Sequence, residues 1–331
     1  ASMLAMRPRR LVLDDPTASL DVSNADRVMD TLVSLRKKHG ITIVMIEHRL
    51  AAALPHADRV VLMDAGKMVF DGAPQDVYVD RTRRDALGLR RDATHRFPPW
   101  DEIIADETPN HGDDPLLVLE DVWAGYAGRD ILRGVDFNLH PGDFAAMVGS
   151  NGAGKTTLAL VAAGLLKPKH GKVRFARRKR PRSGLDVALL FQDAANQLFT
   201  KSVDEEVAFG PRNYGQFDPH DHRQVMTQAD LLAFAGHRPH QLSVGQQQRT
   251  ALAACLALRP RIVILDEPTL GQDWGHLQQI MDYLSQLNAD GTAVLLISHD
   301  YKLVYRYARR VAFIENGRIE RWNHQLERVT L

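Results

Sequence analysis

One stretch of the sequence combines glycines, a lysine and two threonines at a spacing that suits the binding of phosphate groups. It follows the apolar segment Phe144–Val148 and reads Gly149-Ser150-Asn151-Gly152-Ala153-Gly154-Lys155-Thr156-Thr157. Glycines let successive backbone N–H groups turn towards one anion, and the N-terminus of a helix predicted over Leu158–Leu166 would add its positive dipole end. Lys155 would then reach the β- and γ-phosphates, and Thr156 would bring its hydroxyl to Mg²⁺. This pattern predicts a loop that binds a nucleoside triphosphate.

A second apolar run, Ile262–Leu265, ends in the acidic pair Asp266-Glu267. An uninterrupted apolar run is typical of a strand buried on both faces of a parallel sheet, and such sheets bind ligands at the C-terminal edge of their strands. Asp266 is therefore predicted to hold Mg²⁺, and Glu267 to orient and deprotonate an attacking water molecule. An Asp-Glu pair taken alone is more often a solvated turn.

Two further apolar runs lead to polar side chains that suit the same site. Val187–Leu190 precedes Gln192, whose amide could ligate Mg²⁺ and bind the water without adding negative charge. Ala293–Ile297 precedes His299, which could donate a hydrogen bond to the γ-phosphate. Their shared place at the end of apolar strands makes both residues candidates. Tyr126 is either a platform for the nucleotide base or an aromatic residue packed in a turn.

A second candidate anion site lies later in the chain, where a serine and a glycine open another predicted helix. Its residues are Ser243, Gly245 and Gln246, together with the free N–H groups at the helix N-terminus. One domain does not need two phosphate sites for a single nucleotide. Two domains that face each other head to tail would use both.

Taken together, these motifs resemble those of an ABC-type ATPase domain in their order and spacing. They are the phosphate loop, Gln192, Leu242–Gln246, Ile262–Glu267, Asp273 and His299. The resemblance covers nearly all of Leu116–Leu331 and implies an α/β fold: a P-loop NTPase domain with a mostly parallel sheet, a helical subdomain and an antiparallel β subdomain. It also implies ATP and Mg²⁺ as ligands, and two domains that enclose two ATP molecules, closing on ATP and opening after hydrolysis.

Two stretches within this region narrow the resemblance. Asn196–Phe199 and Val203–Pro211 are similar to the ATPases of energy-coupling-factor (ECF) importers and cobalt importers, which take up vitamins or transition-metal ions. The resemblance implies integral membrane partners, namely a T-component-like subunit and a substrate-binding component, at the cytoplasmic face of the cell membrane. In those importers this stretch contacts arginines of a membrane subunit, so Asp204, Glu205 and Glu206 are candidate contacts. Three acidic residues on a helix are also commonly a solvated face.

The start of the chain contains a second, partial copy of the pattern. Arg7–Thr17 repeats Arg259–Thr269, and each is followed by apolar residues at helical spacing, a glycine and a strand-like run that leads to histidine, His48 or His299. Residues 1–80 are therefore predicted to be the C-terminal part of a first ABC ATPase domain, 81–115 a linker, and 116–331 a complete second domain. We interpret the chain as a fragment of a longer tandem protein, whose composite sites require a second ABC ATPase domain or a homodimer partner.

Three positions depart from the family pattern. Val244 stands where glycine is usual and would narrow the approach to the phosphate, and Gln272 replaces a usual leucine without an evident reason. Asp15 replaces the glutamate expected in the first copy. Its carboxylate is retracted by about 1.5 Å, and a displacement of that order can lower a rate ~10²-fold. We therefore expect the first-copy site to be slow or non-hydrolytic.

The composition leaves two alternative functions open. The 42 basic and 41 acidic side chains produce no strong overall field, and the single cysteine, Cys255, excludes an internal disulfide and zinc-binding cysteine pairs. The alternatives are a soluble ABC-superfamily ATPase that acts on nucleic acid or ribosomes, and a fragment unable to hydrolyse ATP. The basic run Arg177–Arg182 favours the first alternative, but its proline and its place after a strand favour an exposed loop, so no nucleic-acid partner is expected.

Overall fold

The computed structural model describes residues 8–17, 22–47, 50–64, 66–80, 82, 114–176, 178, 181–269 and 274–323. The chain divides into two compact units, Ala1–Arg96 with Asp273–Gly275, and Phe97–Gln272 with His276–Leu331. Most of the predicted linker lies outside the described residues, as do His48, Gln272 and Asp273. None of the described helices combines the length and the apolar composition needed to cross a bilayer.

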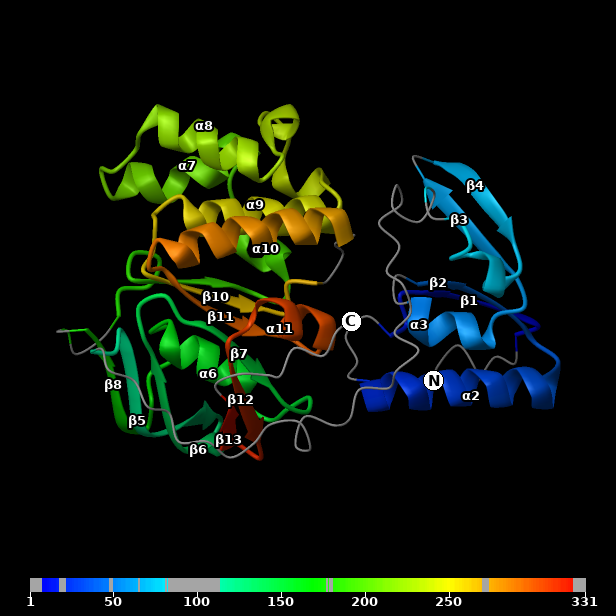
Figure 1. Cartoon of the computed structure of the whole chain (residues 1–331), viewed down its shortest axis with the longest axis horizontal. Coiled ribbons are helices and arrows are strands. Elements are labelled where there is room, and N and C mark those ends of the chain that lie inside the picture. The colour runs from blue at the N-terminus through cyan, green and yellow to red at the C-terminus, as the bar shows by residue number, and fades with distance from the viewer. Residues whose placement is uncertain are drawn as a thin grey trace. The chain divides into compact units, whose positions relative to one another are not determined.

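A six-stranded sheet forms the centre of the second unit, in the order β13-β12-β7-β11-β10-β9 (Figure 1). Its strands are β7 (Phe144–Val148), β9 (Val187–Leu190), β10 (Ile262–Asp266), β11 (Ala293–Ile297), β12 (Arg310–Glu315) and β13 (Arg318–Asn323). All neighbours are parallel except β12 and β13. The strands predicted from apolar runs are confirmed, and every residue of β7, β9, β10 and β11 is buried.

The register of this sheet brings the candidate residues to one edge. Leu190 lies opposite Leu265, Asp266 lies opposite Ile297, and Ile297 in turn lies opposite Met147. Because parallel strands all end at the same edge of a sheet, the polar residues that follow these strands and the loop that follows β7 emerge together there.

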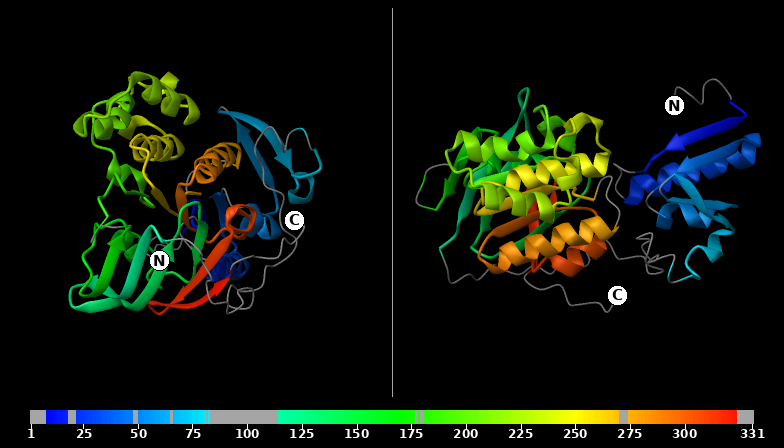
Figure 2. Two further views of the ribbon diagram at one scale, coloured as in Figure 1. Left: turned by 60° about the vertical axis from the view of Figure 1, so that its left-hand side comes forward. Right: turned by 90° about the horizontal axis from the view of Figure 1, so that it is seen from above.

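Two further groups of elements flank the sheet (Figures 1 and 2). An antiparallel sheet consists of β5 (Leu117–Tyr126), β6 (Arg129–Leu139) and β8 (His170–Phe175), in the order β6-β5-β8. A helical group consists of α7 (Val203–Asn213), α8 (Pro219–Gln228) and α9 (Val244–Leu256), with its own core around Val207, Met226 and Leu242. The remaining helices are α6 (Lys155–Ala162), η3 (Ala194–Gln197), η4 (Leu232–Phe234), η5 (Pro239–Gln241), α10 (Trp274–Ala289) and α11 (Tyr301–Tyr307).

The prediction of a helix over Leu158–Leu166 is wrong at its C-terminal end. Helix α6 ends at Ala162, because Gly164 adopts a left-handed conformation with φ of +74°. The backbone N–H groups of Leu165 and Leu166 donate to the carbonyl of Leu160, which closes the helix end. Glycine is the residue that adopts this conformation at least cost.

The first unit contains a smaller set of elements. They are β1 (Arg10–Asp14), α2 (Val22–His39), β2 (Thr42–Ile46), α3 (Leu50–Ala53), η1 (Leu54–His56), β3 (Val60–Asp64), β4 (Lys67–Gly72) and η2 (Pro74–Asp76). Strands β1 and β2 are parallel, and β3 and β4 form an antiparallel hairpin. Their order along the chain matches that of β10, α10, β11, α11, β12 and β13 in the second unit.

Candidate functional site

The glycines of the phosphate loop adopt backbone conformations that other residues rarely reach. The φ angles of Gly149, Gly152 and Gly154 are +149°, +82° and +113°. A Cβ atom on Gly149 would lie 2.1 Å from the carbonyl oxygen of Ile314, and one on Gly154 would lie 2.9 Å from a methyl group of Leu132. The backbone of Ile314 therefore leaves no room for a side chain at Gly149, whereas at Gly154 the Leu132 side chain would have to shift.

Lys155 is buried and turns back over the loop that it follows. Its Nζ atom donates hydrogen bonds to the carbonyl oxygens of Gly149, at 2.8 Å, and Ser150, at 2.9 Å. These bonds satisfy an ammonium group that burial would otherwise make costly. They also hold the positive charge inside the curve of the loop.

A hydrogen bond joins the start of α6 to the end of β10. The hydroxyl of Thr156 donates to Oδ2 of Asp266 at 2.7 Å. Burial raises the pKa of the Asp266 carboxyl, and the hydrogen bond from Thr156 and the charge of Lys155 oppose that rise. A buried carboxylate beside a hydroxyl offers the hard oxygen ligands that Mg²⁺ prefers, and a cation there would relieve the cost of the burial. These residues therefore fit a magnesium ion.

Glu267 and His299 meet at the same edge. His299 donates from its backbone N–H to Glu267 at 3.4 Å, and its Nε2 lies 3.3 Å from Glu267 Oε1 and 2.9 Å from Oδ1 of Asn151 in the loop. Glu267 itself has a φ of +50°, an unusual conformation for a residue with a side chain. Such local strain persists where surrounding contacts impose it, and it is common at functional sites.

The other candidate residues lie on neighbouring elements. Gln192 is exposed just beyond the end of β9, and Tyr126 is half exposed at the tip of the β5–β6 hairpin. Ser243 caps the N-terminus of α9, which belongs to the helical group (Figure 1). The structure thus brings Asn151, Lys155, Thr156, Asp266, Glu267 and His299 together. Gln192 follows β9 at the same edge of the sheet, whereas Tyr126 belongs to the antiparallel sheet and Ser243 to the helical group.

Fewer backbone N–H groups at the N-terminus of α9 are available to an anion than the sequence indicated. The backbone N–H of Gln246 donates to the hydroxyl of Ser243, and the backbone N–H of Ser243 donates to Oε1 of Gln246. This reciprocal capping box uses two of the N–H groups predicted to be free for an anion. Val244 is 58% exposed beside it, where an incoming ligand would meet its side chain.

The prediction that all three acidic residues of α7 are available to a partner is wrong for Glu206. This side chain is 4% exposed and accepts hydrogen bonds from the backbone N–H groups of Phe199 and Thr200, at 3.0 and 2.8 Å. Asp204 is bonded to His222 at 2.7 Å but remains about half exposed, and Glu205 is exposed. Glu206 therefore organises the turn before α7.

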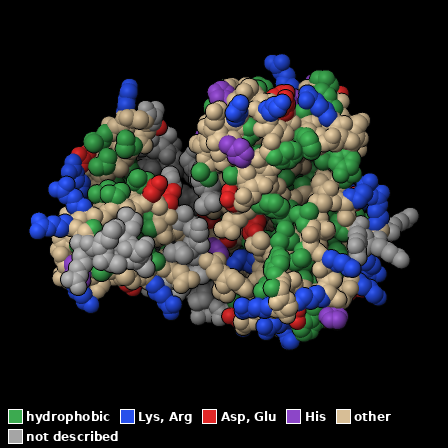
Figure 3. Space-filling model, turned by 180° about the vertical axis from the view of Figure 1, so that it is seen from behind, with side chains coloured by type: hydrophobic (Ala, Val, Ile, Leu, Met, Phe, Trp, Pro, Cys, Tyr) green, Lys and Arg blue, Asp and Glu red, His purple; other side chains and the backbone are tan. Residues whose placement is uncertain are grey.

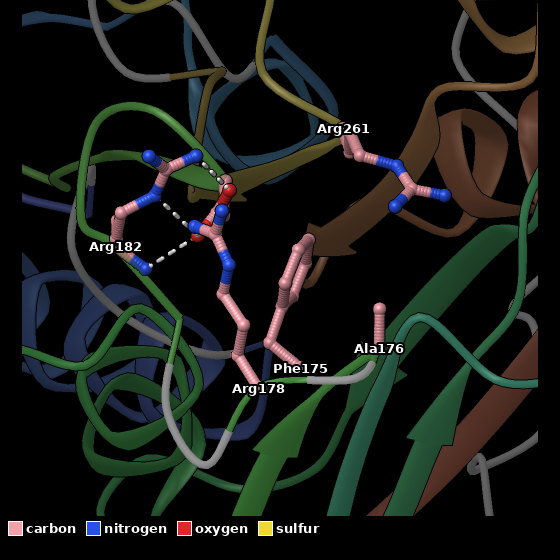
Figure 4. Close-up of a pocket in the computed structure, with 6 residues that line it drawn as sticks. Phe175, Ala176, Arg178, Arg182 and Arg261 are labelled. Carbon is pink, nitrogen blue, oxygen red and sulfur yellow. Dashed lines mark hydrogen bonds and ion pairs between the residues drawn. The ribbon is translucent and has the colours of Figure 1, made fainter.

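A cavity of about 450 Å³ lies outside this site, next to the predicted basic run (Figure 4). Its lining includes Arg178 and Arg182, which both pair with the buried carboxylate of Asp186. Burial would raise the pKa of Asp186, but the hydrogen bonds from Arg182 outweigh it and the pKa is lowered. Arg178 and Arg182 of the basic run thus stabilise the fold by pairing with a buried carboxylate. Its residues Arg177, Lys179 and Arg180 lie outside the described residues.

Comparison with known proteins agrees with this geometry. The family model described as ABC transporter matches residues 132–270. Those residues are an ABC transporter ATP-binding domain. An ABC transporter ATP-binding protein of Methanosarcina acetivorans is 32% identical over 370 residues, covering 96% of this chain and 60% of that protein. A Methanosarcina mazei protein of the same description is also 32% identical, with 96% and 62% covered. The chain thus spans about 60% of the length of these relatives.

Solved structures of ABC cassettes resemble about two thirds of this chain. The cbiO1 protein of Clostridium perfringens, described as part of the ABC transporter complex cbiONQ, is 30% identical with a TM-score of 0.55, covering 64% of this chain and 89% of its own. A dimeric cassette in a post-hydrolysis state bound to ADP and Pi is 26% identical with a TM-score of 0.58, covering 64% and 99%. The predicted α/β fold of an ABC-type ATPase domain is confirmed.

Proposed function

We propose that the chain is an ATP-binding and ATP-hydrolysing part of a membrane importer of the energy-coupling-factor type, which takes up a vitamin or a transition-metal ion. The observation that carries the proposal is the convergence of Lys155, Thr156, Asp266, Glu267 and His299 at one edge of the parallel sheet. The similarity to cbiO1 of Clostridium perfringens supports the choice of importer class.

In this proposal each side chain has a stated role in the ATP site. The backbone N–H groups of residues 149–157 and the ammonium of Lys155 bind the phosphates. Thr156, Asp266 and Gln192 are the residues that would hold Mg²⁺, which neutralises the phosphate charge when it is bound. Glu267 accepts a proton from the attacking water, and His299, already bonded to Glu267 and Asn151, donates to the γ-phosphate. Tyr126 stacks on the base.

The proposed hydrolysis requires two domains. Ser243, Gly245 and Gln246 lie on α9, away from the phosphate loop of their own domain, and would contact a nucleotide bound to a facing domain. Two chains paired through their second units could supply both halves. The ATPase rate per chain is then expected to rise with protein concentration. A constant specific activity in a proven monomer would contradict this pairing.

The exposed surface at the start of α7 suits the membrane partner. Phe199 is 64% exposed and packs edge-on against Phe209, with ring centroids 4.8 Å apart. Asp204 and Glu205 are in the first turn of α7, the helix that also carries Phe209. An apolar surface next to acidic groups matches a helix that carries both apolar residues and arginine. The partners proposed are the integral membrane subunits of such an importer, at the cytoplasmic face.

Co-purification with a polytopic membrane protein tests this surface. We expect Phe199→Ala and Glu205→Arg each to weaken the association, because one removes the apolar contact and the other reverses the charge. Asp290→Arg is the matched control, since Asp290 is exposed on a turn far along the chain from α7. Equal binding by all three variants would exclude the surface, and salt-dependent binding of RNA or DNA would favour the nucleic-acid alternative.

The first unit is proposed to be a weak or inactive hydrolytic site. Asp15 occupies the place of Glu267, with a φ of +44° and a backbone N–H bonded to Ile46, as the N–H of Glu267 is bonded to Ile297. The backbone is therefore alike while the side chain is one methylene shorter. Asp15→Glu in a protein that carries two whole domains is expected to raise turnover, and unchanged ATPase activity would contradict the proposal.

A further inference from the structure

The strand that leads to Gln192 lies at the edge of the sheet. Strand β9 is the last in the order β13-β12-β7-β11-β10-β9, and among the described strands it pairs only with β10. Backbone groups two residues apart in a strand point to the same side, so an edge strand presents donors and acceptors that need other partners. At the end of β9 these groups are the carbonyl of Leu189 and the N–H of Phe191.

The side chain of Gln197 bonds both groups. Its Nε2 donates to the carbonyl of Leu189 at 2.8 Å, and its Oε1 accepts from the N–H of Phe191 at 2.8 Å. A residue of a neighbouring parallel strand makes the same pair of bonds with its own N–H and C=O. The amide of Gln197 therefore takes the place of the N–H and C=O of one residue in a seventh strand. A carboxylate lacks the donor for this arrangement, and an apolar side chain lacks both groups.

A third element binds at the same point. The thiol of Cys255, on α9, donates to the carbonyl of Leu189 at 3.5 Å. Burial raises the pKa of this thiol to about 12, so it keeps its proton at neutral pH and remains a donor. The Phe191 side chain packs on the main core of the second unit. The end of β9 is thus held by η3, by α9 and by the core.

The segment that carries Gln197 is also held at its other end. Glu206 accepts the backbone N–H groups of Phe199 and Thr200, immediately after η3. At the start of η3, the carboxylate of Asp193 accepts from the N–H of Ala195 and from the amide of Asn196. The short stretch from Asp193 to Thr200 is therefore a braced unit, with the exposed Phe199 near one end and Gln192 just outside the other.

We propose that Gln197 is a positioning residue: its amide fixes the end of β9 and so the direction in which Gln192 enters the ATP site. The proposal rests on the proposed function of Gln192 as a ligand of Mg²⁺ and of the attacking water.

Hydrogen exchange tests whether the two hydrogen bonds of Gln197 hold the end of β9, an arrangement that we call the clamp. This test needs no assumption about function. We expect Gln197→Leu to increase amide exchange at Phe191 about tenfold, because a lost hydrogen bond lowers the local cost of opening. Asn196→Ala is the matched control, since Asn196 is exposed on the same turn and bonds only locally to Asp193. Unchanged exchange at Phe191 in Gln197→Leu would overturn the clamp.

A double-mutant cycle with Gln192 tests the positioning role. The measured quantity is the gain in ATP affinity on adding Mg²⁺. Gln197→Leu and Gln197→Glu should both reduce this gain while leaving the Mg²⁺-free ATP affinity unchanged. The second variant controls for loss of folding, because glutamate keeps the size of the glutamine side chain and an acceptor oxygen for the N–H of Phe191. In a Gln192→Ala background neither change should have a further effect.

The two experiments separate the possible failures. Equal losses in the wild-type and Gln192→Ala backgrounds would overturn the positioning role, because Gln197 would then act without Gln192. No effect of Gln192→Ala on the Mg²⁺-dependent gain would refute the proposed role of Gln192, and the positioning role with it. The clamp at the edge of β9 would still be decided by hydrogen exchange alone.

Discussion

Strand β10 in the second unit and strand β1 in the first have matching residues in different surroundings. Ile264, at the centre of β10, is 0% exposed, whereas Val12, at the corresponding place in β1, is 61% exposed. Ile46 of β2 is likewise 53% exposed, and its counterpart Ile297 is buried. In the second unit these strands share a core with Met147 of β7 and Leu158 of α6.

In the second unit, the elements that carry the phosphate loop have two tasks. Strand β7 and helix α6 carry the loop. Strand β7 also pairs with β11 in the sheet, and α6 packs in the same core as β10 and β11. In the first unit, apolar side chains are exposed on β1 and β2 and on the β3–β4 hairpin, among them Met63 and Met68. Figure 3 shows hydrophobic side chains gathered on the surface at its upper left. The nucleotide site and the core of an ABC domain therefore depend on the same segment.

The two regions nevertheless agree in local geometry. Asp14 lies opposite Ile46 as Asp266 lies opposite Ile297, and both β-hairpins shift register at corresponding points, after Leu62 and after Phe313. These features are common to the two units. They are set by neighbouring residues and strand pairing, whereas the burial of the same positions is set by distant parts of the chain.

The largest difference between the units should appear in hydrolysis. Glu267→Gln removes the proposed general base, a change expected to lower the ATPase rate about 10²- to 10⁴-fold at concentrations where chains pair. Asp15→Asn is the control in the first unit and should leave the rate of this chain unchanged. The rate of phosphate release from both variants tests this prediction. A lower rate for Asp15→Asn would show that the first unit takes part in hydrolysis.

The second prediction concerns ATP affinity. Lys155→Ala should weaken ATP binding about 10- to 100-fold, because a hydrogen bond from a charged group to phosphate is worth about 1.5–3 kcal/mol. Lys167→Ala, an exposed lysine beyond α6, is the control. Titration calorimetry should give one site per chain for the wild type. A second site that survives Lys155→Ala would mean that the first unit binds ATP independently.

The third prediction compares stability at matched positions. Ile264→Ala should lower the free energy of unfolding by about 2–5 kcal/mol, as expected for deleting a buried apolar side chain. Val12→Ala should change it by about 0.5 kcal/mol or less, because Val12 is largely exposed. Urea unfolding followed by circular dichroism measures both. A large cost at Val12 would show that its face of β1 is covered in solution.

The smallest effect is expected from neutralising the aspartates at the strand ends. Burial raises the pKa of Asp266 in the folded chain, so its charged form is disfavoured there at pH 7. Asp266→Asn should therefore raise the melting temperature at pH 7, by an amount that shrinks as the pH falls towards 4 and the carboxyl becomes protonated. Asp14→Asn should have no such effect, because Asp14 is exposed. A lower melting temperature for Asp266→Asn at pH 7 would contradict the argument.

Residue types and spacing were enough to predict the phosphate loop, the buried parallel strands and the edge where Asp266, Glu267 and His299 emerge. The physical reason is that apolar runs without a polar face must lie inside a parallel sheet, whose strands all end at one edge. The glycines at 149, 152 and 154 likewise predict the conformation of the loop, because few other residues adopt their backbone angles.

Only the tertiary structure decided which partner each polar side chain has. Glu206 reads as one of three surface acids, yet it is buried against the backbone of the preceding turn. Gln197 reads as one polar residue among several, yet its amide completes the edge of β9. Such contacts depend on where a turn returns in space, and neither periodicity nor composition records that. Val12 of β1 is exposed and Ile264 of β10 is buried for the same reason, since the burial of a side chain depends on which other elements pack against it.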